Sequence, residues 1–445
     1  MKILVLAAGR SKRMKPVEDK NFLNFLGQPL IKWQLDMLWE NGFKDVVLVG
    51  GAHNLDRLRE LDNDMPMKID VVLQENLDEG MKGAVLAAED LIKDDEVMIF
   101  SSNDVVSSEA FKIMKEAAEA DLDADGFLLA KKVTEYFPGG YLSLDDDDFI
   151  NGVIEKPEPG SEPSDLINLV VHYFRDTKIL IKNLKKAESK KDDLYEKALD
   201  TMILEGAKLR AVGYDGYWQA IKYPWHVGPV FEYFLDLRLG GKERDISGGA
   251  DVSDNAVIDG KVIIGDGARV MDGATVKGPC YIGRKTIVAT NALVRGSNLG
   301  ESCVIGFSTE VARSYLGDNV WTHSNYIGDS VIGNDVSFGA GAVVGNLRLD
   351  EGMIEVAANG QTAGNKVSTG TNKWGLVTGD HVRVGVNTSF MPGVRVGGES
   401  FVGAGIVVAE DIPKKSFVRG KWDLKISENK GEFSEEMREM MRKKL

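Results

Sequence analysis

The sequence predicts an α/β doubly wound domain followed by a parallel β-helix, and two observations lead there. Apolar strand-like segments and amphipathic helical segments alternate through the first 240 residues. Further on, an aliphatic residue returns at every sixth position, at Val252, Ile258, Ile264, Val270, Val276, Ile282, Val288 and Val294. A helix repeats every 3.6 residues and a flat strand every 2, so a six-residue period indicates a coil of short strands that turn a corner each time.

The α/β part is predicted element by element from apolar runs and helical faces. Strands are expected at residues 2–8, 45–49, 69–74, 97–100 and 208–214, with a hairpin at 140–144 and 149–155. Helices are expected around 30–38 and at 83–92, 192–205 and 227–239, and segments 166–174 and 178–186 continue the α/β pattern. This alternation predicts a doubly wound parallel sheet, in which ligands collect beyond the carboxyl ends of the strands.

The six-residue rhythm is interrupted once. It resumes at Ile332, Phe338 and Val344 and again from Val384. Val344 and Val384 are 40 positions apart, which is not a multiple of six, so a long loop is predicted between them, and long ordered loops are usually functional. A basic run follows Pro413, and a short helix is expected from Ser434. The predicted domains are therefore 1–240, 248–413 and a tail at 414–445.

Composition excludes several classes of protein. A net charge of −15 argues against general nucleic-acid affinity, and no apolar run approaches the length of a membrane span. Two cysteines, Cys280 and Cys303, cannot form a disulfide framework and suit a reducing cytosol, so a cytoplasmic location is expected.

A first candidate site lies in LAAGRSKRMKP, residues 6–16, followed by Lys20 and then GQPLI. A tight turn at Ala7, Ala8 and Gly9 lets backbone N–H groups approach a nucleotide, while Arg13 and Lys20 supply charge for a triphosphate. These motifs resemble the sugar-phosphate nucleotidylyltransferase family. The resemblance implies an NTP and a sugar 1-phosphate as substrates, Mg²⁺ as cofactor, and further residues: Gln74 to read the base, Asp104 as metal ligand, and Gly140, Glu155, Lys156 and Asn168 as sugar-phosphate contacts.

The chain departs from that family's pattern at several positions. Ser11, Asn21 and Lys82 replace residue types usual in the family, and Ala220 stands where the family has a second metal-binding Asp. Three alternatives remain open: two working sites, a sugar-nucleotide-binding regulatory or scaffold protein, or nucleotidyl transfer alone with a coil that only trimerises.

A second candidate site lies in THSNYIGDSVIG, residues 322–333, and GAGAVVGNLRLD, residues 339–350. An amine attacking an acetyl thioester needs a base of near-neutral pKa, and His323 fits that need. The two segments resemble the acetyltransferase half of bifunctional enzymes that make UDP-N-acetylglucosamine. The resemblance implies Tyr326 and Asn346 as positioning or stabilising groups.

Departures from the acetyltransferase pattern bring in two more candidates. Arg313 stands beside a lost lysine, and Lys373 substitutes for another. The same resemblance implies acetyl-CoA as co-substrate, with its phosphates near the basic run at 414–419. It also implies a left-handed coil and a homotrimer or dimer of trimers.

Overall fold

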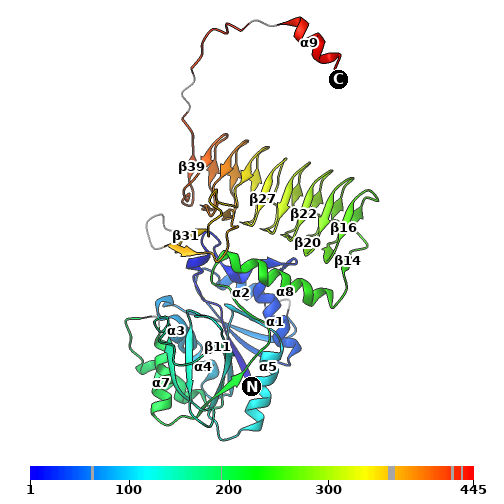
Figure 1. The fold of residues 1–445 in the computed structure, drawn as a ribbon. Helices are drawn as coiled ribbons and strands as arrows, with labels where there is room; N and C mark the ends of the chain where they lie inside the picture. Colours follow the sequence, from blue (N-terminus) through cyan, green and yellow to red (C-terminus); the bar gives the residue numbers. More distant parts are fainter. Residues whose placement is uncertain (62–64, 192, 359–365, 422–424, 432–433, 445) are drawn as a thin grey trace.

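The computed structural model describes residues 1–61, 65–191, 193–358, 366–421, 425–431 and 434–444. Figure 1 shows an α/β part at the N-terminal end and a stacked coil of strands beside it. The two are joined through helix α8 (Val227–Leu239).

The sheet of the α/β part has the order β10-β9-β11-β6-β1-β4-β5, and β8 and β12 extend from β11. Its bounds are β1 (Lys2–Leu6), β4 (Asp45–Gly50), β5 (Lys68–Leu73), β6 (Val97–Ser101), β8 (Gly126–Lys132), β9 (Gly140–Leu144), β10 (Ile150–Glu155), β11 (Leu166–Phe174) and β12 (Leu209–Gly213). β1, β4, β5 and β6 run parallel, but β11 is antiparallel to β6 and to β8. The predicted hairpin is present as β9 and β10, but the predicted parallel order does not extend to β11, so the sheet is mixed.

Helices cover both faces of this sheet. Ile3 and Val5 of β1 pack toward one face with α1 (Leu30–Glu40), α2 (Leu55–Glu60) and α5 (Glu109–Ala120). Leu4 and Leu6 pack toward the other with α3 (Gly80–Ala87), α4 (Glu89–Ile92), α6 (Thr177–Lys186) and α7 (Leu194–Leu204). This alternation is the reason that β1 reads as a continuous apolar run. The sequence analysis missed α5 and β8. Among the described residues, no helix is long and apolar enough to cross a membrane.

Three columns of short parallel strands form the coil, and strands pair with the equivalent strand of the next turn. The second column is divided into two four-stranded sheets, which single bridges from Trp321 to Val304 and Ser337 connect. The first column holds β14 (Arg244–Ile246), β17 (Val262–Ile264), β20 (Cys280–Ile282), β23 (Asn298–Leu299), β26 (Tyr315–Leu316), β28 (Val331–Ile332), β33 (Val377–Thr378) and β36 (Arg395–Val396). The second holds β15 (Asp251–Val252), β18 (Arg269–Val270), β21 (Ile287–Val288), β24 (Val304–Ile305), β29 (Ser337–Phe338), β34 (Arg383–Val384), β37 (Phe401–Val402) and β39 (Phe417–Val418). The third holds β16 (Val257–Asp259), β19 (Thr275–Lys277), β22 (Leu293–Arg295), β25 (Glu310–Ala312), β27 (Tyr326–Gly328), β30 (Val343–Val344), β35 (Ser389–Phe390) and β38 (Val407–Val408).

The aliphatic residues at sixth positions fill the interior of the coil, as the period predicts. The predicted interruption is also present, because β30 pairs with β35, Val343 opposite Ser389, across the inserted segment. That segment carries the antiparallel hairpin of β31 (Glu355–Ala357) and β32 (Lys366–Ser368), and its residues 359–365 lie outside the described part. In the tail, α9 (Glu435–Arg442) begins after Ser434, whose hydroxyl accepts from the Met437 N–H, and stands apart from the coil in Figure 1.

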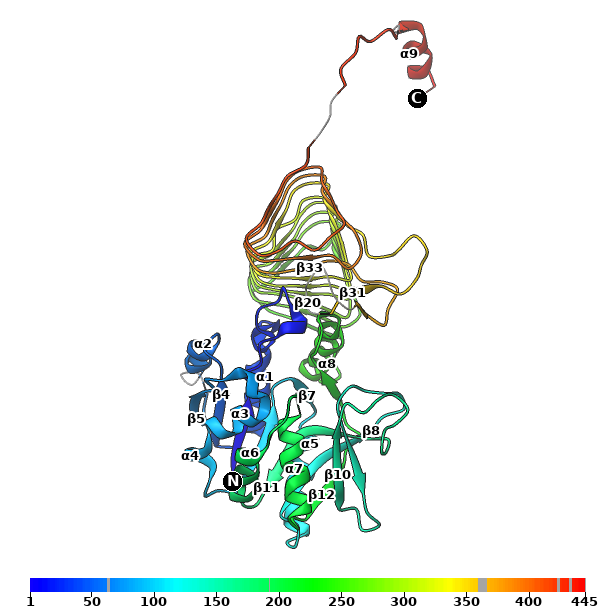
Figure 2. The ribbon, with the colours of Figure 1, turned by 90° about the vertical axis from the view of Figure 1, so that its left-hand side faces the viewer.

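The two parts share one hydrophobic cluster. The hairpin of β2 (Asn24–Phe25) and β3 (Gln28–Pro29) and helix α8 pack against the first column of the coil, where the Phe25 ring contacts both Phe234 of α8 and Tyr315 of the coil. The Tyr315 hydroxyl accepts from the Asn24 backbone N–H at 2.9 Å. Figure 2 shows α8 and a blue segment of the N-terminal region lying under the coil, while the N-terminus itself lies at the far end of the α/β part. The hairpin begins four residues after Lys20, so the coil supports the chain that carries that lysine.

Candidate functional site

The loop after β1 is held by buried amides. The Ala7 carbonyl accepts from the side chains of Asn21 and Asn54, at 3.0 Å each. Ala7 and Ala8 are buried, while Gly9 is exposed. Asn21 stands where the resemblance expects proline, and its amide now serves to fix the loop.

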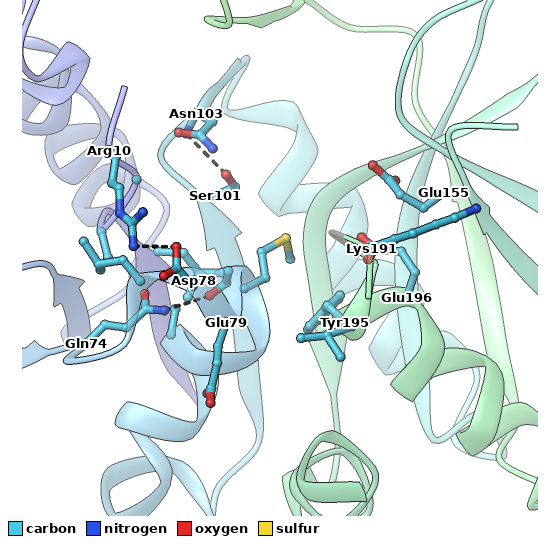
Figure 3. A pocket seen from close by; sticks show the side chains of 18 of the residues that line it. Arg10, Gln74, Asp78, Glu79, Ser101, Asn103, Glu155, Lys191, Tyr195 and Glu196 are labelled. Atoms are coloured by element: carbon cyan, nitrogen blue, oxygen red, sulfur yellow. Dashed lines mark hydrogen bonds and ion pairs between the residues drawn. The ribbon is translucent and has the colours of Figure 1, made fainter. Parts of the chain in front are cut away.

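A pocket of about 690 Å³ opens beside this loop. Of the predicted residues it brings together Ala8, Gly9, Gln74 and Glu155, and it adds Arg10, Lys12, Asn103, Lys191, Tyr195 and Glu196. Figure 3 shows Arg10, Gln74 and Asp78 on one wall and Glu155, Lys191, Tyr195 and Glu196 on the other. Arg10 is paired with Asp78 at 2.8 Å. The pocket thus combines a nucleotide-loop wall with a second wall from β10 and α7.

The side-chain amide of Gln74 has a defined orientation. Its nitrogen donates to the backbone carbonyls of Asn76 at 3.0 Å and Gly80 at 2.9 Å. Because both partners only accept, the NH₂ group must face them and the carbonyl oxygen Oε1 must face away. Gln74 therefore offers a ligand an acceptor.

Lys20, Asp104 and Lys222 form a charged cluster behind the loop. Lys20 Nζ donates to the Ile221 carbonyl at 2.8 Å, Lys222 Nζ donates to the Pro138 carbonyl at 2.8 Å, and Asp104 Oδ1 accepts from Trp218 Nε1 at 2.8 Å. Burial lowers the pKa of Lys20 and of Lys222 to about 8, although the Asp104 charge opposes the shift. Burial also raises the pKa of Asp104, against the Trp218 hydrogen bond and both lysines. Arg13 lies 5.9 Å from the ring centre of Tyr223.

Ala220 lies directly opposite Asp104. The short strands β7 (Asp104–Val106) and β13 (Trp218–Ala220) pair antiparallel, with Ala220 as the register partner of Asp104. Opposed residues of such a pair project from the same face with their Cβ atoms about 4.5–5.5 Å apart. A carboxylate at position 220 would therefore lie beside Asp104.

Gly140 and Asn168 lie beside Glu155, which lines the second wall of the pocket. Gly140 and Glu155 are register partners of β9 and β10, and a Cβ added at Gly140 would lie 3.3 Å from Glu155 Oε2 and 3.6 Å from the Asn168 Cβ. Lys156 is ion-paired with Glu155 at 2.6 Å. The register of the antiparallel strands thus brings all four predicted sugar-phosphate residues together.

In the coil, four side chains form one hydrogen-bonded network. Arg313 donates twice to Asp329, Nε to Oδ1 at 2.6 Å and Nη2 to Oδ2 at 2.7 Å. The Asn346 amide nitrogen donates to Asp329 and to the Tyr326 hydroxyl. Both N–H groups of the Asn346 side chain are therefore engaged, so, as at Gln74, the side-chain oxygen is the atom that remains to accept a hydrogen bond from a ligand. The absence of a side chain at Gly328 makes space for this network, since a Cβ there would lie 2.6 Å from the Tyr326 hydroxyl.

His323 and Lys373 are exposed at the edge of the coil. Within the described residues the His323 imidazole has no hydrogen-bond partner, and Lys373 bridges backbone-to-backbone with Leu347 at the base of the inserted segment. In the basic run, Lys414 is ion-paired with Glu18 at 2.7 Å and Glu399 at 3.2 Å. Lys414 therefore joins the coil to the loop of the α/β part.

Residues 2–221 match the family model for nucleotidyl transferase. A bifunctional sugar-1-phosphate nucleotidylyltransferase/acetyltransferase of Sulfurisphaera tokodaii is 31% identical over 425 residues, which are 94% of this chain and 100% of the relative. The chain belongs to this family of bifunctional enzymes. Bifunctional protein GlmU of Methanococcus maripaludis is 31% identical, covering 97% of this chain and 100% of the relative. That of Methanocaldococcus jannaschii is 31% identical, covering 95% and 98%.

Within this member of the family, sequence reasoning missed several residues at the two sites. Asp329 anchors the coil network, and Tyr195 and Lys191 line the pocket. No local signal marks them, because Tyr195 reads as a helix residue and Asp329 as a turn residue at φ 50°. Only the folding of separate segments against each other makes them neighbours of the site.

Proposed function

We propose that the chain carries two transferase sites: a sugar-1-phosphate nucleotidylyltransferase in the α/β part and an acetyltransferase in the coil that acts on an amino-sugar phosphate. The observation that carries the first assignment is the pocket between the Gly9 loop and the wall that includes Glu155. Full-length similarity to relatives named for both activities supports the pair. The products would serve nucleotide-sugar synthesis.

In the first reaction, a phosphate oxygen of the sugar 1-phosphate attacks the α-phosphorus of the NTP. The bond from that phosphorus to the β-phosphate oxygen breaks, and pyrophosphate leaves with the electron pair. No covalent bond to the protein is needed, so the work is positioning and charge stabilisation. Arg13 and Lys20 are proposed to stabilise the triphosphate, Ala7, Ala8 and Gly9 to approach it through backbone groups, and Gly140, Glu155, Lys156 and Asn168 to hold the sugar phosphate.

The proposed base preference follows from Gln74. Its amide presents an acceptor, because two backbone carbonyls hold its NH₂ group. An acceptor pairs with the ring N–H of uracil or thymine, or with N1–H of guanine, whereas adenine and cytosine carry an acceptor at the equivalent ring nitrogen and donate only through their exocyclic amino group. We therefore expect nucleotides whose base has a ring N–H, namely UTP, dTTP or GTP, to exceed ATP and CTP in pyrophosphate release.

The site around Asp104 could hold Mg²⁺ through a single carboxylate. Asp104 keeps one oxygen free while Trp218 donates to the other, and Mg²⁺ is commonly held by one or two carboxylates together with substrate phosphates. The ion would neutralise charge on the phosphates during transfer. Among the described residues no group of three or more His, Cys, Asp or Glu side chains is arranged for a metal ion, so Asp104 is the proposed protein ligand.

In the second reaction, the amine nitrogen of the sugar attacks the acetyl carbonyl of acetyl-CoA, the carbon–sulfur bond breaks, and the CoA thiolate leaves. His323 is proposed to accept the proton released by the amine. Tyr326 and Asn346 are proposed to position the amine. Arg313 is proposed to act through Asp329, and Lys373 to contact substrate phosphate.

The same proposal assigns residues 1–240 to a nucleotidyltransferase domain, 248–413 to a left-handed β-helix and 414–445 to a tail. A homotrimer or a dimer of trimers is proposed for the assembly. The exposed position of His323 on the coil edge supports a site that a neighbouring subunit completes.

A second candidate function rests on Ala220. With alanine opposite Asp104, the first site offers the metal ion one carboxylate, which favours a protein that binds a sugar nucleotide without turnover. Two assays distinguish the pair of transferase activities from a binding protein. The first measures pyrophosphate release from each NTP with a panel of sugar 1-phosphates, and the second measures thiol release from acetyl-CoA with amino-sugar phosphates. Activity abolished by Asp104→Ala and His323→Ala respectively supports two enzymes. Silence in both assays, with ligands still raising the unfolding temperature, overturns them in favour of a binding protein.

A further inference from the structure

A buried polar triad joins strand β11 to α7, the helix that contributes Tyr195 to the second wall of the pocket. His172 on β11 is fully buried, and its Nδ1 lies 2.8 Å from the Tyr195 hydroxyl of α7. Its Nε2 lies 2.8 Å from Asn168 Oδ1. The strand is irregular between Leu169 and His172, where its register against β8 shifts. This irregularity accompanies the approach of two side chains that a regular strand would hold about 13 Å apart.

The hydrogen-bond partners settle which nitrogen carries the proton. Tyr195 is buried, and within the described residues its hydroxyl has no partner other than His172. A buried hydroxyl proton needs an acceptor, so it goes to Nδ1. Nε2 then carries the ring proton and donates it to Asn168 Oδ1. Burial lowers the pKa of His172 to about 3, against a smaller opposite effect of the Leu169 backbone, so the ring is neutral at physiological pH.

The carboxamide of Asn168 is thereby oriented. With Oδ1 accepting from His172, the NH₂ group points the other way, and within the described part of the chain it has no partner. Asn168 lies against Gly140, which in turn lies beside Glu155. An unengaged donor pair next to a carboxylate suits a sugar phosphate, whose oxygens accept hydrogen bonds.

We propose that His172 is a positioning residue that fixes the Asn168 amide with its NH₂ group toward the sugar 1-phosphate, and that Tyr195 fixes the tautomer of His172. The inference rests on the proposed role of Asn168 in nucleotidyl transfer. Tyr195 also lines the pocket, so the triad ties the position of α7 to the orientation of the sugar-binding amide.

Two substitutions at position 172 separate the two hydrogen bonds. The carboxamide of His172→Asn reaches the place of Nδ1, where it accepts from Tyr195 but leaves Asn168 without a donor. The longer His172→Gln reaches the place of Nε2 and restores that donor. We expect His172→Asn to raise KM for N-acetylglucosamine 1-phosphate about tenfold, the effect of losing one oriented hydrogen bond, and His172→Gln to return it to within about threefold of wild type. KM for the NTP stays unchanged in both, which a general loss of packing would not produce.

A spectroscopic arm tests the tautomer without any activity. In protein labelled with ¹⁵N-histidine, the signals absent from His172→Asn identify His172 among the five histidines. We expect a neutral ring protonated on Nε2 with no titration between pH 5 and 8. A ring protonated on Nδ1, or one that titrates in this window, overturns the proposal whether or not the enzyme is active.

Asn168→Ala provides the reference for kinetics. If it raises KM for the sugar phosphate while His172→Asn does not, the positioning role is refuted and the site assignment stands. If Asn168→Ala leaves KM unchanged, the assignment of Asn168 and the inference built on it both fail. If wild type releases no pyrophosphate with any substrate pair, nucleotidyl transfer fails by itself. Calorimetric binding of N-acetylglucosamine 1-phosphate to the same variants then decides the inference, equal binding by wild type and His172→Asn refuting it.

Discussion

Replacing Ala220 by Asp is expected to make the first site a tighter Mg²⁺ site. Position 220 is 4% exposed and lies directly opposite Asp104, so the new carboxylate would lie about 5 Å from an ion held there. At an effective dielectric constant of about 20, one negative charge and a divalent cation at this distance attract by about 7 kcal/mol before desolvation. Desolvation of the carboxylate offsets several kcal/mol of that. A net gain of about 1–2 kcal/mol remains, which is about five- to thirtyfold in affinity.

The assay measures the unfolding temperature across a Mg²⁺ titration, with and without UTP, because this temperature reports ion binding even when the protein catalyses no reaction. Without Mg²⁺ the variant should unfold at a lower temperature than wild type, since the buried carboxylate then lies beside Asp104. With Mg²⁺ the order should reverse, and pyrophosphate release should reach half its maximum at a lower Mg²⁺ concentration. Ala220→Asn is the matched control, equal in size but uncharged. An identical Mg²⁺ dependence for the Asp and Asn variants would refute the reasoning.

Three further predictions follow from the same geometry. Gly328→Ala should reduce acetyl transfer at least about tenfold and leave pyrophosphate release unchanged, because its Cβ would displace the Tyr326 hydroxyl from Asn346; equal loss in both assays would contradict this. Asp329→Asn should weaken acetyl transfer by raising KM for the amino sugar, since Asn346 loses the acceptor that orients it, and Asp335→Asn, at another arginine pair of the coil, is the control. Lys20 has a folded-state pKa near 8 against an ordinary 10.5, so the unfolded state binds more protons between those values. Its contribution to stability should therefore rise with pH across that window, and denaturant unfolding of Lys20→Met should lack this rise.

The sequence by itself determined the repeating coil and the position of the loop that follows the first strand. The six-residue period survives folding because each turn buries its aliphatic residue against the next, so a local pattern specifies the whole column. The loop at Ala7 to Gly9 was equally readable, since it follows directly from a buried strand. The break between Val344 and Val384 was visible as a failure of the period, and the structure places an inserted hairpin there.

Only the tertiary structure decided which groups meet and how each is oriented. Ala220 faces Asp104, and His172 holds Asn168 while it contacts Tyr195, because separate strands and a helix pack together. The antiparallel course of β11 also escaped prediction, since a strand's apolar pattern is the same in either direction. Hydrogen-bond direction depends on the partner as well as the residue: Gln74 and Asn346 both present acceptors because their donors are already engaged.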